Sequence, residues 1–383
     1  MRIVHVIAEF SAHEAMGRTV TEIAQRVPGE HFVITTNAHD GQEVFAEVVE
    51  LGGAVETFPL GRRDALDSAL ARLQPDLVHV HGGALVPMLV TRTAIPWYPN
   101  LLTMYAWPVL PSLRRLRAGG IRAAMQSNVL RPRVLASSVL PKWLVKRSLR
   151  RSGTREVLTP DPRVERKLGA TRVGSGGPQD SRRAVYTDQA PVVLFAGRAE
   201  SVRGIDTLLA CFPDVVREVP DARLRLLLIP RPELDALLET ARAAGLGENL
   251  DVVTEPVADL LGEMAAAQVG TWPFKYDYTT SPPAMAAAEA LSVGLPTVGT
   301  EVSCVEAVIE DGVNGDLVPP ADAKALAAAI VRLLKDREAW DRYHAAGPES
   351  VTRNLSWEGM GRAVAQAYSD VLGSEVESRQ EAI

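Results

Sequence analysis

The chain is short of cysteine, of long apolar runs and, over one stretch, of acidic side chains. Its 383 residues include two cysteines, Cys211 and Cys304, and no Cys-x-x-Cys pair. We therefore expect neither a disulfide framework nor a cysteine metal site. A protein of a reducing compartment is the simpler interpretation. No stretch approaches 18 uncharged apolar residues, so we expect no membrane-spanning helix.

The acidic gap lies between Asp76 and Glu156. That window contains no acidic residue but 13 basic ones, although the chain as a whole carries a net charge of −6. An acidic protein with one purely basic segment points to a localised anionic partner.

Length and composition favour a globular protein of two domains. Two domains of roughly 180 residues each suit the length, and the shares of apolar (46%) and charged (23%) residues are ordinary. The first residues, 2–7, predict a strand rather than the apolar core of a signal peptide. The expected location is the cytoplasm, and peripheral attachment to the inner face of the membrane is left open.

Short apolar strands alternate with amphipathic helices along both halves, which predicts parallel sheets covered on both faces. A glycine-rich turn at 173–180 precedes a fresh strand at 192–195 and marks the domain boundary. We expect an α/β protein with domains at 1–180 and 181–356, the first completed by a helix at 357–383. The expected strands are 3–7, 31–36, 77–80, 101–104, 192–195, 224–229, 251–254, 269–274 and 296–298; the expected helices are 17–26, 66–73, 233–244, 260–267, 284–293 and 323–334.

The segment 195–206 is the most informative for chemistry. A strand ends there, Gly197 allows close backbone approach, and Arg198 and Arg203 precede a helix. Arginines at a helix N-terminus suit a diphosphate, which they hold by bidentate hydrogen bonds and charge. The alternative is a pair of surface arginines in an ordinary strand–helix turn.

A second segment joins a proline turn to a helix. Pro282 and Pro283 suit the first positions of a helix, and Glu289 follows among alanines. A carboxylate is costly to bury unless it is liganded, and a ribose diol would satisfy both oxygens. A solvent-facing glutamate is the alternative.

With Gly294-Leu295-Pro296-Thr297, Glu306 and Asp311-Gly312-Val313-Asn314-Gly315, these segments resemble the retaining glycosyltransferases of family 4. The resemblance spans nearly the whole chain: Pro75–Gly82 and Gly17 carry it more weakly in the first half, and Leu355-Ser356-Trp357 and Tyr368 resemble the family's final helix. It implies a GT-B fold, two Rossmann-like doubly wound domains facing each other across a cleft.

The resemblance also implies roles. Arg198 and Arg203 would neutralise the donor diphosphate, Glu289 would bind the ribose, and the loop 281–284 would contact sugar and phosphates. We take Arg198, Arg203, His81 and Tyr105 as candidate catalytic residues, and Gly17, Gly197, Ser281, Pro283, Ala284 and Glu289 as donor-binding candidates. Catalysis would be retaining and independent of metal or cofactor, and UDP is expected rather than GDP.

Three positions depart from the family pattern. Ser281 stands where the family often has a glutamate that contacts the sugar. Tyr105 stands where a histidine is common, and a tyrosine can still donate a hydrogen bond to a sugar hydroxyl. The turn Pro230-Arg231-Pro232 replaces a glycine-rich one.

His79 and His81 lie in the strand that ends at Gly82. We expect their side chains to point to opposite faces, with His81 in the cleft. A packed, hydrogen-bonded histidine is the alternative.

Residues 106–155 mix basic residues with Trp107, Trp143 and aliphatic side chains. This pattern favours an amphipathic surface at an anionic membrane and hence a lipid-linked acceptor. A solvated basic face, or a site for a soluble anionic acceptor, stays open. No nucleic-acid motif accompanies the charge.

The predicted function is transfer of a hexose or N-acetylhexosamine from a nucleoside-diphosphate sugar. The alternatives are the same chemistry on a soluble acceptor, such as a natural product or thiol precursor, and a non-catalytic binding subunit. The sequence does not indicate an oligomeric state.

Overall fold

The computed structural model divides the chain into two compact units, each described here by itself. It describes residues 1–11, 15–53, 62–82, 98–105, 107, 112–126, 135, 138–174, 176–177, 180–277, 279–280 and 282–380. The first unit comprises Met1–Pro108, Pro132–Gly176 and Trp357–Ile383; the second comprises Val109–Arg131 and Gly177–Ser356.

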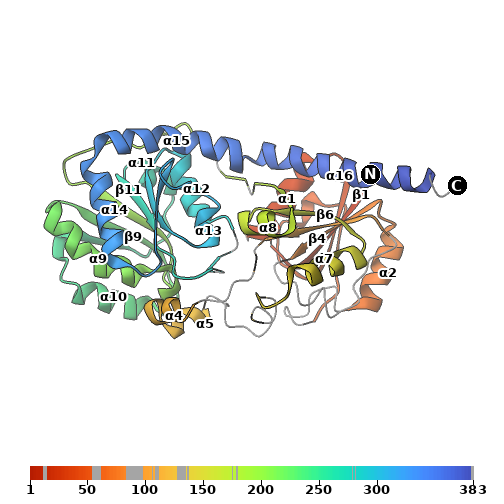
Figure 1. The fold of residues 1–383 in the computed structure, drawn as a ribbon, viewed down its shortest axis with the longest axis horizontal. Coiled ribbons are helices and arrows are strands. Elements are labelled where there is room, and N and C mark those ends of the chain that lie inside the picture. The colour runs from red at the N-terminus through yellow and green to blue at the C-terminus, as the bar shows by residue number, and fades with distance from the viewer. Residues whose placement is uncertain are drawn as a thin grey trace. The chain divides into compact units, whose positions relative to one another are not determined.

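In the described part of the first unit, parallel strands form a sheet of order β3-β2-β1-β4-β5-β6-β7 (Figure 1). The strands are β1 (Arg2–Phe10), β2 (Glu30–Ala38), β3 (Glu47–Glu50), β4 (Leu77–Gly82), β5 (Asn100–Met104), β6 (Thr154–Thr159) and β7 (Thr171–Arg172). The helices are α1 (Ala15–Arg26), α2 (Arg63–Leu73), α7 (Lys142–Arg151), α8 (Pro162–Leu168) and α16 (Trp357–Gln380), with a 3-10 turn η1 (Gln42–Val44).

One face of this sheet is covered by α1 and α16. Ile3, Leu77 and Leu101 from the strands pack with Ile23 of α1 and Tyr368 of α16 in one buried cluster. Strands β1 and β4 are buried almost throughout, as expected for a parallel sheet with helices on both faces. The order of strands reverses at β1 and β4, which is where such sheets place their ligands.

The described second unit contains a smaller parallel sheet of order β10-β9-β8-β11-β12-β13. Its strands are β8 (Val192–Arg198), β9 (Arg223–Ile229), β10 (Leu250–Val253), β11 (Val269–Trp272), β12 (Thr297–Thr300) and β13 (Gly315–Val318). Its helices are α4 (Leu113–Gly119), α5 (Ile121–Gln126), α9 (Ile205–Glu218), α10 (Leu234–Ala243), α11 (Leu260–Ala265), α12 (Met285–Ser292), α13 (Ser303–Glu306), α14 (Ala323–Lys335) and α15 (Arg337–Leu355), with 3-10 turns η3 (Ser201–Arg203) and η4 (Gly247–Asn249).

The second sheet also reverses its order, at β8 and β11. Helices from both sides bury one continuous apolar core that includes Phe195, Phe212 and Trp272. The predicted α/β architecture of two Rossmann-like units is confirmed.

The division between the units differs from the predicted one in an internal segment and at the boundary, since the second unit begins at Gly177 rather than at 181. The sequence placed all of 1–180 in one domain, but Val109–Arg131 groups with the second unit. The reason is packing: Ala123 and Ala124 of α5 are buried against Val202 and Tyr276, and the Tyr276 hydroxyl donates to the Gly120 carbonyl at 3.1 Å.

The chain enters its last helix at a break next to Ser356. Helix α15 ends at Leu355, Ser356 is extended, and α16 starts at Trp357 and lies beside α1. No helix in the described part of the chain is both long and apolar enough to span a bilayer. Cys211 and Cys304 are buried and unpaired, and burial raises the pKa of each thiol to about 12.

Candidate functional site

The carboxyl end of β8, at the reversal point of the second sheet, carries the predicted pair Gly197 and Arg198. A Cβ on Gly197 would lie 3.2 Å from the Phe195 ring, so the backbone is close to its neighbours there. Arg198 is exposed, and its side chain makes no hydrogen bond or ion pair with any residue that the structure describes. Within the part of the chain that the structure describes, it is a cation without a counter-ion, at the edge where α/β folds bind ligands.

Arg203 occupies a different environment from Arg198. Its side chain is 13% exposed, its Nε donates to Glu200 Oε2 at 3.1 Å, and its guanidinium lies 5.2 Å from the centroid of the Phe274 ring. Burial lowers the pKa of Arg203 and nearby Arg198 adds to this, while Glu200 opposes it. Arg203 is thus a cation whose position is fixed by Glu200 and Phe274 and whose charge is partly neutralised by Glu200.

Gly204 makes the turn between Arg203 and α9. Its φ is +76°, and a Cβ would lie 1.8 Å from the Pro273 carbonyl oxygen in the segment after β11. Only glycine fits this close approach. It brings the ends of β8 and β11 together.

Lys275 lies at the same carboxyl edge of the sheet, and the sequence analysis did not predict it as a site residue. Its side chain is 5% exposed, and Nζ contacts Asp206 Oδ2 at 2.6 Å. Its position three residues past β11, at the end of a strand beside β8, was the signal that could have found it. With Arg198 and Arg203 it adds a third basic side chain around the end of β8.

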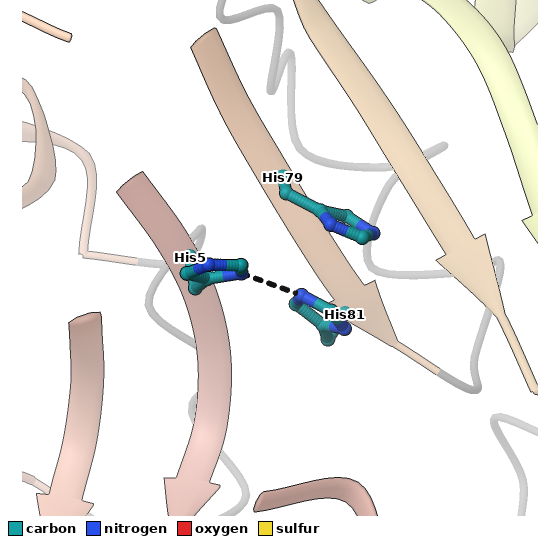
Figure 2. A group of neighbouring side chains, drawn as sticks. All are labelled: His5, His79 and His81. Atoms are coloured by element: carbon teal, nitrogen blue, oxygen red, sulfur yellow. Dashed lines mark hydrogen bonds between the residues drawn. The ribbon is translucent and has the colours of Figure 1, made fainter. Parts of the chain in front are cut away.

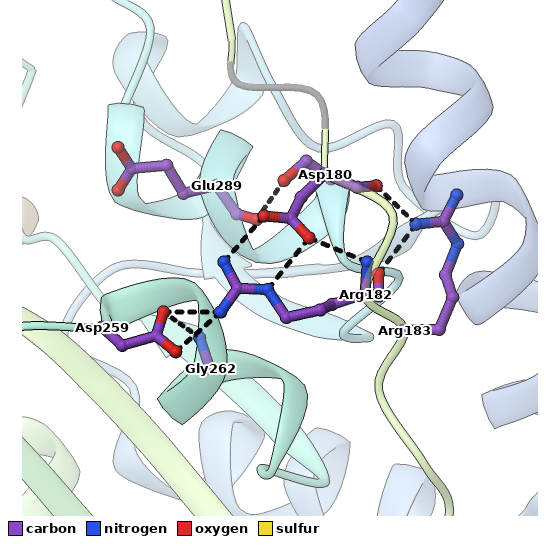
Figure 3. Close-up of polar contacts among 7 residues, drawn as sticks. Asp180, Arg182, Arg183, Asp259, Gly262 and Glu289 are labelled. Atoms are coloured by element: carbon purple, nitrogen blue, oxygen red, sulfur yellow. Dashed lines mark hydrogen bonds and ion pairs between the residues drawn. The ribbon is translucent and has the colours of Figure 1, made fainter.

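The proline turn leads into α12 as predicted, but Ser281 lies outside the described residues. Pro283 and Ala284 are buried. The Ala284 amide donates to the Cys304 carbonyl at 2.8 Å, so this amide is already used. Glu289 is partly buried on α12, and its carboxylate points away from Asp180 and Asp259 in Figure 3.

An ion-pair network that the sequence did not predict lies near Glu289 (Figure 3). The Arg182 guanidinium bridges Asp180, at 2.7 Å, and Asp259, at 2.5 Å, and the Gly262 amide donates to Asp259 at 3.0 Å. Hydrogen bonds from Arg182 lower the pKa of Asp180 to about 2. The network connects residues 180–182, which lie just after the start of the second unit, to the start of α11.

In the first unit, Gly17 lies in the first turn of α1. A Cβ there would lie 2.0 Å from the Ser11 carbonyl oxygen, which follows directly on β1. A glycine is required by this close contact. The predicted candidate therefore lies at the carboxyl end of β1, at the reversal point of its sheet.

The expectation that His79 and His81 point to opposite faces is wrong. Residues two apart in a strand share a face, and the two imidazole centroids are 3.9 Å apart. Figure 2 shows both rings from β4 beside the ring of His5 from β1. All three histidines are fully buried, so the packed, hydrogen-bonded alternative describes His81.

Tyr105 directly follows β5 and lies against His81. Its hydroxyl is 3.3 Å from His81 Nδ1, and its ring is buried. Burial raises the pKa of Tyr105, and a hydrogen bond from Thr19 of α1 opposes this. Both hydrogen-bonding directions of the hydroxyl are thus occupied by protein.

The basic segment falls into two parts in different units. In the first unit, Val145 and Leu149 of α7 face the core, whereas Trp143 is 64% exposed beside exposed Lys146 and Arg147. The outer face of α7 is therefore basic with one large apolar side chain.

In the second unit, α4 and α5 expose large apolar side chains. Leu113, Ile121 and Met125 are exposed, with Arg117 and Arg122 among them. Single exposed apolar residues are normal on a surface, so this exposure by itself marks no binding site.

Comparison with known proteins identifies the domain that holds Arg198, Arg203 and Glu289. Residues 190–336 match the family model for glycosyl transferases group 1. This part of the chain is a glycosyl transferases group 1 domain, and the resemblance inferred from the sequence is confirmed there.

Two curated relatives align with about half of the chain. Phosphatidyl-myo-inositol mannosyltransferase of Mycobacterium leprae is 30% identical over 197 residues, 51% of this chain and 51% of the relative. D-inositol 3-phosphate glycosyltransferase of a Nocardioides species is 28% identical over 224 residues, 54% of this chain and 49% of the relative. The chain spans about half the length of these relatives.

Among solved structures, the Anabaena protein Alr3699/HepE in complex with UDP superposes with a TM-score of 0.70. The match covers 97% of this chain and 100% of that one at 14% identity. A likeness at this identity concerns the fold alone, and it is the two-domain fold of the GT-B glycosyltransferases.

Proposed function

We propose that this chain, whose residues 190–336 form a glycosyl transferases group 1 domain, transfers a hexose or N-acetylhexosamine from a nucleoside-diphosphate sugar. The observation that carries the proposal is Arg198, an exposed cation without a partner among the described residues, at the carboxyl end of β8. A diphosphate supplies the missing negative charge.

Arg198 and Arg203 have separate tasks in this proposal. Arg198 is free to form bidentate hydrogen bonds with the diphosphate. Arg203, held by Glu200 and Phe274, supplies a fixed positive charge where the leaving phosphate gains negative charge. A fixed cation needs no reorganisation during the reaction.

The other donor contacts follow from the same domain. Glu289 binds the ribose hydroxyls, and the Ser281–Ala284 loop contacts the sugar and phosphates. Transfer is retaining and independent of a metal, with the departing phosphate accepting the proton of the acceptor hydroxyl. UDP is the expected nucleotide, and the UDP complex of a protein with the same fold supports it.

The test of this function is nucleotide release from a panel of UDP- and GDP-sugars, with candidate acceptors added. We expect one donor to release nucleotide in an acceptor-dependent way, and NMR of the product to show an unchanged anomeric configuration. Nucleotide binding without release for any acceptor would instead identify a non-catalytic binding subunit.

The proposed acceptor is lipid-linked and lies at an anionic membrane surface. The outer face of α7 supports this, since exposed Lys146 and Arg147 lie one helical turn after the exposed Trp143. Each basic residue near an anionic surface contributes about 1 kcal/mol. The named activity of the mycobacterial relative, on phosphatidyl-myo-inositol, agrees with such an acceptor.

A soluble phosphorylated acceptor is the second candidate. It is favoured by the relative named for D-inositol 3-phosphate, because an anionic sugar phosphate also suits a basic surface. Co-sedimentation with vesicles of mixed anionic and neutral lipid distinguishes the two. A membrane acceptor predicts binding that weakens as salt rises, and no binding at low salt would leave the soluble acceptor.

A further inference from the structure

Three buried histidines and Tyr105 form a continuous row of hydrogen-bonded groups on one face of the first sheet. His31 Nδ1 lies 2.9 Å from His5 Nε2, and His5 Nδ1 lies 3.1 Å from His81 Nε2. His81 Nδ1 lies 3.3 Å from the Tyr105 hydroxyl. Figure 2 shows the contact between His5 and His81. The row crosses β2, β1, β4 and the end of β5.

Both ends of the row lie on α1 or directly after it. At one end, His31 Nε2 is 2.8 Å from the carbonyl oxygen of Val27, the residue after α1. At the other end, the Tyr105 hydroxyl is hydrogen-bonded to Thr19, in the N-terminal half of α1. The row therefore links the two ends of one helix through the strands beneath it.

The Val27 carbonyl determines the position of every proton in the row. A carbonyl only accepts, so His31 Nε2 carries a hydrogen and donates it. In a neutral imidazole the other nitrogen then accepts, so His5 Nε2 donates to His31 Nδ1.

The same step repeats along the row. His81 Nε2 donates to His5 Nδ1, and the Tyr105 hydroxyl donates to His81 Nδ1. All three histidines are the Nε2–H tautomer. The Tyr105 oxygen is left as an acceptor, and Thr19 occupies that side.

The neutral state follows from burial. Desolvation lowers the pKa of His31 and, further, that of His5, and it lowers the pKa of His81 to about 3. The histidines thus stay uncharged at physiological pH. A proton passed from Tyr105 into the row would have to remain on one of these weak bases, so the row does not act as a relay.

His5, His79 and His81 also have the ligand number of a zinc site. However, the facing nitrogens of His5 and His81 already share one proton at 3.1 Å. A metal ion would have to displace this shared proton. A divalent ion would also bring two positive charges into a buried site whose described ligands are all neutral imidazoles. The hydrogen-bonded row accounts for both nitrogens without that cost.

We propose that His31, His5 and His81 are positioning residues that hold the Tyr105 hydroxyl towards Thr19 and so fix the N-terminal half of α1. That half carries Gly17 against the end of β1. Tyr105 is then a positioning residue as well, and does not donate to the sugar. The proton order stands on its own, and its effect on substrate binding rests on the proposed function.

The direct test is the tautomer of each histidine, read from two-bond ¹H–¹⁵N correlation spectra of the unaltered protein. We expect His5, His31 and His81 to be neutral Nε2–H tautomers from pH 6.5 to 8. His344 is an internal control of the opposite kind, because its Nδ1 lies 2.8 Å from the Gly294 carbonyl. An Nδ1–H tautomer, titration in this range, or a stoichiometric metal ion bound at these nitrogens would overturn the proposal.

A matched pair of variants tests the effect on substrate binding. Tyr105 and Tyr368 are both buried and both hydrogen-bonded to a histidine of β4, but Tyr368 contacts His79, outside the row. We expect Tyr105→Phe to raise the KM for the nucleotide sugar several-fold with a smaller change in kcat. Tyr368→Phe should lose similar stability and keep its KM.

Equal KM values in the two variants would contradict the positioning role. Absence of transfer by the unaltered protein would contradict the proposed function alone, since the tautomer spectra are read without substrate. The two failures are therefore distinguishable.

Discussion

Arg198 and Arg203 lie five residues apart, and the structure gives them different surroundings. Arg198 is exposed without a partner among the described residues, whereas Arg203 is held by Glu200 and Phe274. The ion pair between Arg203 and Glu200 could be predicted from their spacing of three residues. The contact with Phe274 was not, because it joins segments that meet only in the folded sheet.

Arg198→Ala should weaken binding of the donor nucleotide roughly 10- to 100-fold. A hydrogen bond to a charged group contributes about 1.5–3 kcal/mol, and the nearby Arg203 and Lys275 are already paired with Glu200 and Asp206. Titration calorimetry measures the change. Arg223→Ala is the matched control, an exposed arginine at the amino end of β9 on the opposite edge of the same sheet. Equal affinities in the two variants would refute the assignment of Arg198.

The histidines of the first sheet predict a loss of stability in mild acid. Their pKa values are lowered in the folded state, so the unfolded state binds more protons below about pH 6.5. The free energy of unfolding therefore falls with pH, by about 1 kcal/mol for each of His5, His79 and His81 between pH 7.5 and 5.5. Urea unfolding at the two pH values measures the sum, to which His31 adds because its pKa is lowered as well.

His81→Asn checks that these groups are the cause. Whatever the substitution does to absolute stability, it removes one titrating group and should reduce the difference between the two pH values by about 1 kcal/mol. An unchanged difference would show that His81 does not titrate as described.

At the scale of elements, the sequence predicted helices and strands with clear boundary residues, such as proline or glycine. It did not predict those without such residues. Helix α12 was predicted within a residue at each end, because prolines precede it and Gly294 follows it. Strands β3, β6, β7 and β13 were missed. Strands β3, β7 and β13 have at most four residues and lie at the edges of their sheets, and β6, next to an edge, mixes charged with apolar residues. The side-chain directions of His79 and His81 on β4 were predicted wrongly although the sequence contains the information, because residues two apart in a strand share a face.

The basic segment shows where an amphipathic pattern is ambiguous. The apolar side chains Val145 and Leu149 of α7 proved to be core residues, leaving Trp143 and the basic side chains outside. The membrane proposal thus relies on charge more than on insertion of an apolar face.

Lys146→Glu should weaken binding to anionic vesicles about 30-fold, since reversing one charge near the surface costs about 2 kcal/mol. Co-sedimentation at low salt is the measurement. Lys324→Glu is the control, with the same change in net charge at an exposed position on α14 of the second unit. A similar loss in both variants would indicate a general charge effect and remove α7 from the proposal.

At the scale of the whole molecule, the alternation of strands and helices was enough to predict two doubly wound units. The assignment of Val109–Arg131 was not predictable, because it depends on Tyr276, more than 150 residues further along the chain. The ion pairs of Arg182 were hidden for the same reason, since Asp259 is 77 residues away. Sequence patterns locate the ends of strands, whereas the pairing of side chains there requires the fold.

Thermal unfolding with added nucleotides tests most directly the central claim that the second unit binds a nucleoside diphosphate. Binding to the folded state alone stabilises it by about 2.7 kcal/mol at a ligand concentration 100 times Kd. For a domain of this size, that raises Tm by roughly 5–10 °C. We expect UDP, or failing that GDP, to produce this shift and the matching nucleoside without phosphates to produce little. No shift with any nucleoside diphosphate or nucleotide sugar at millimolar concentration would contradict the account.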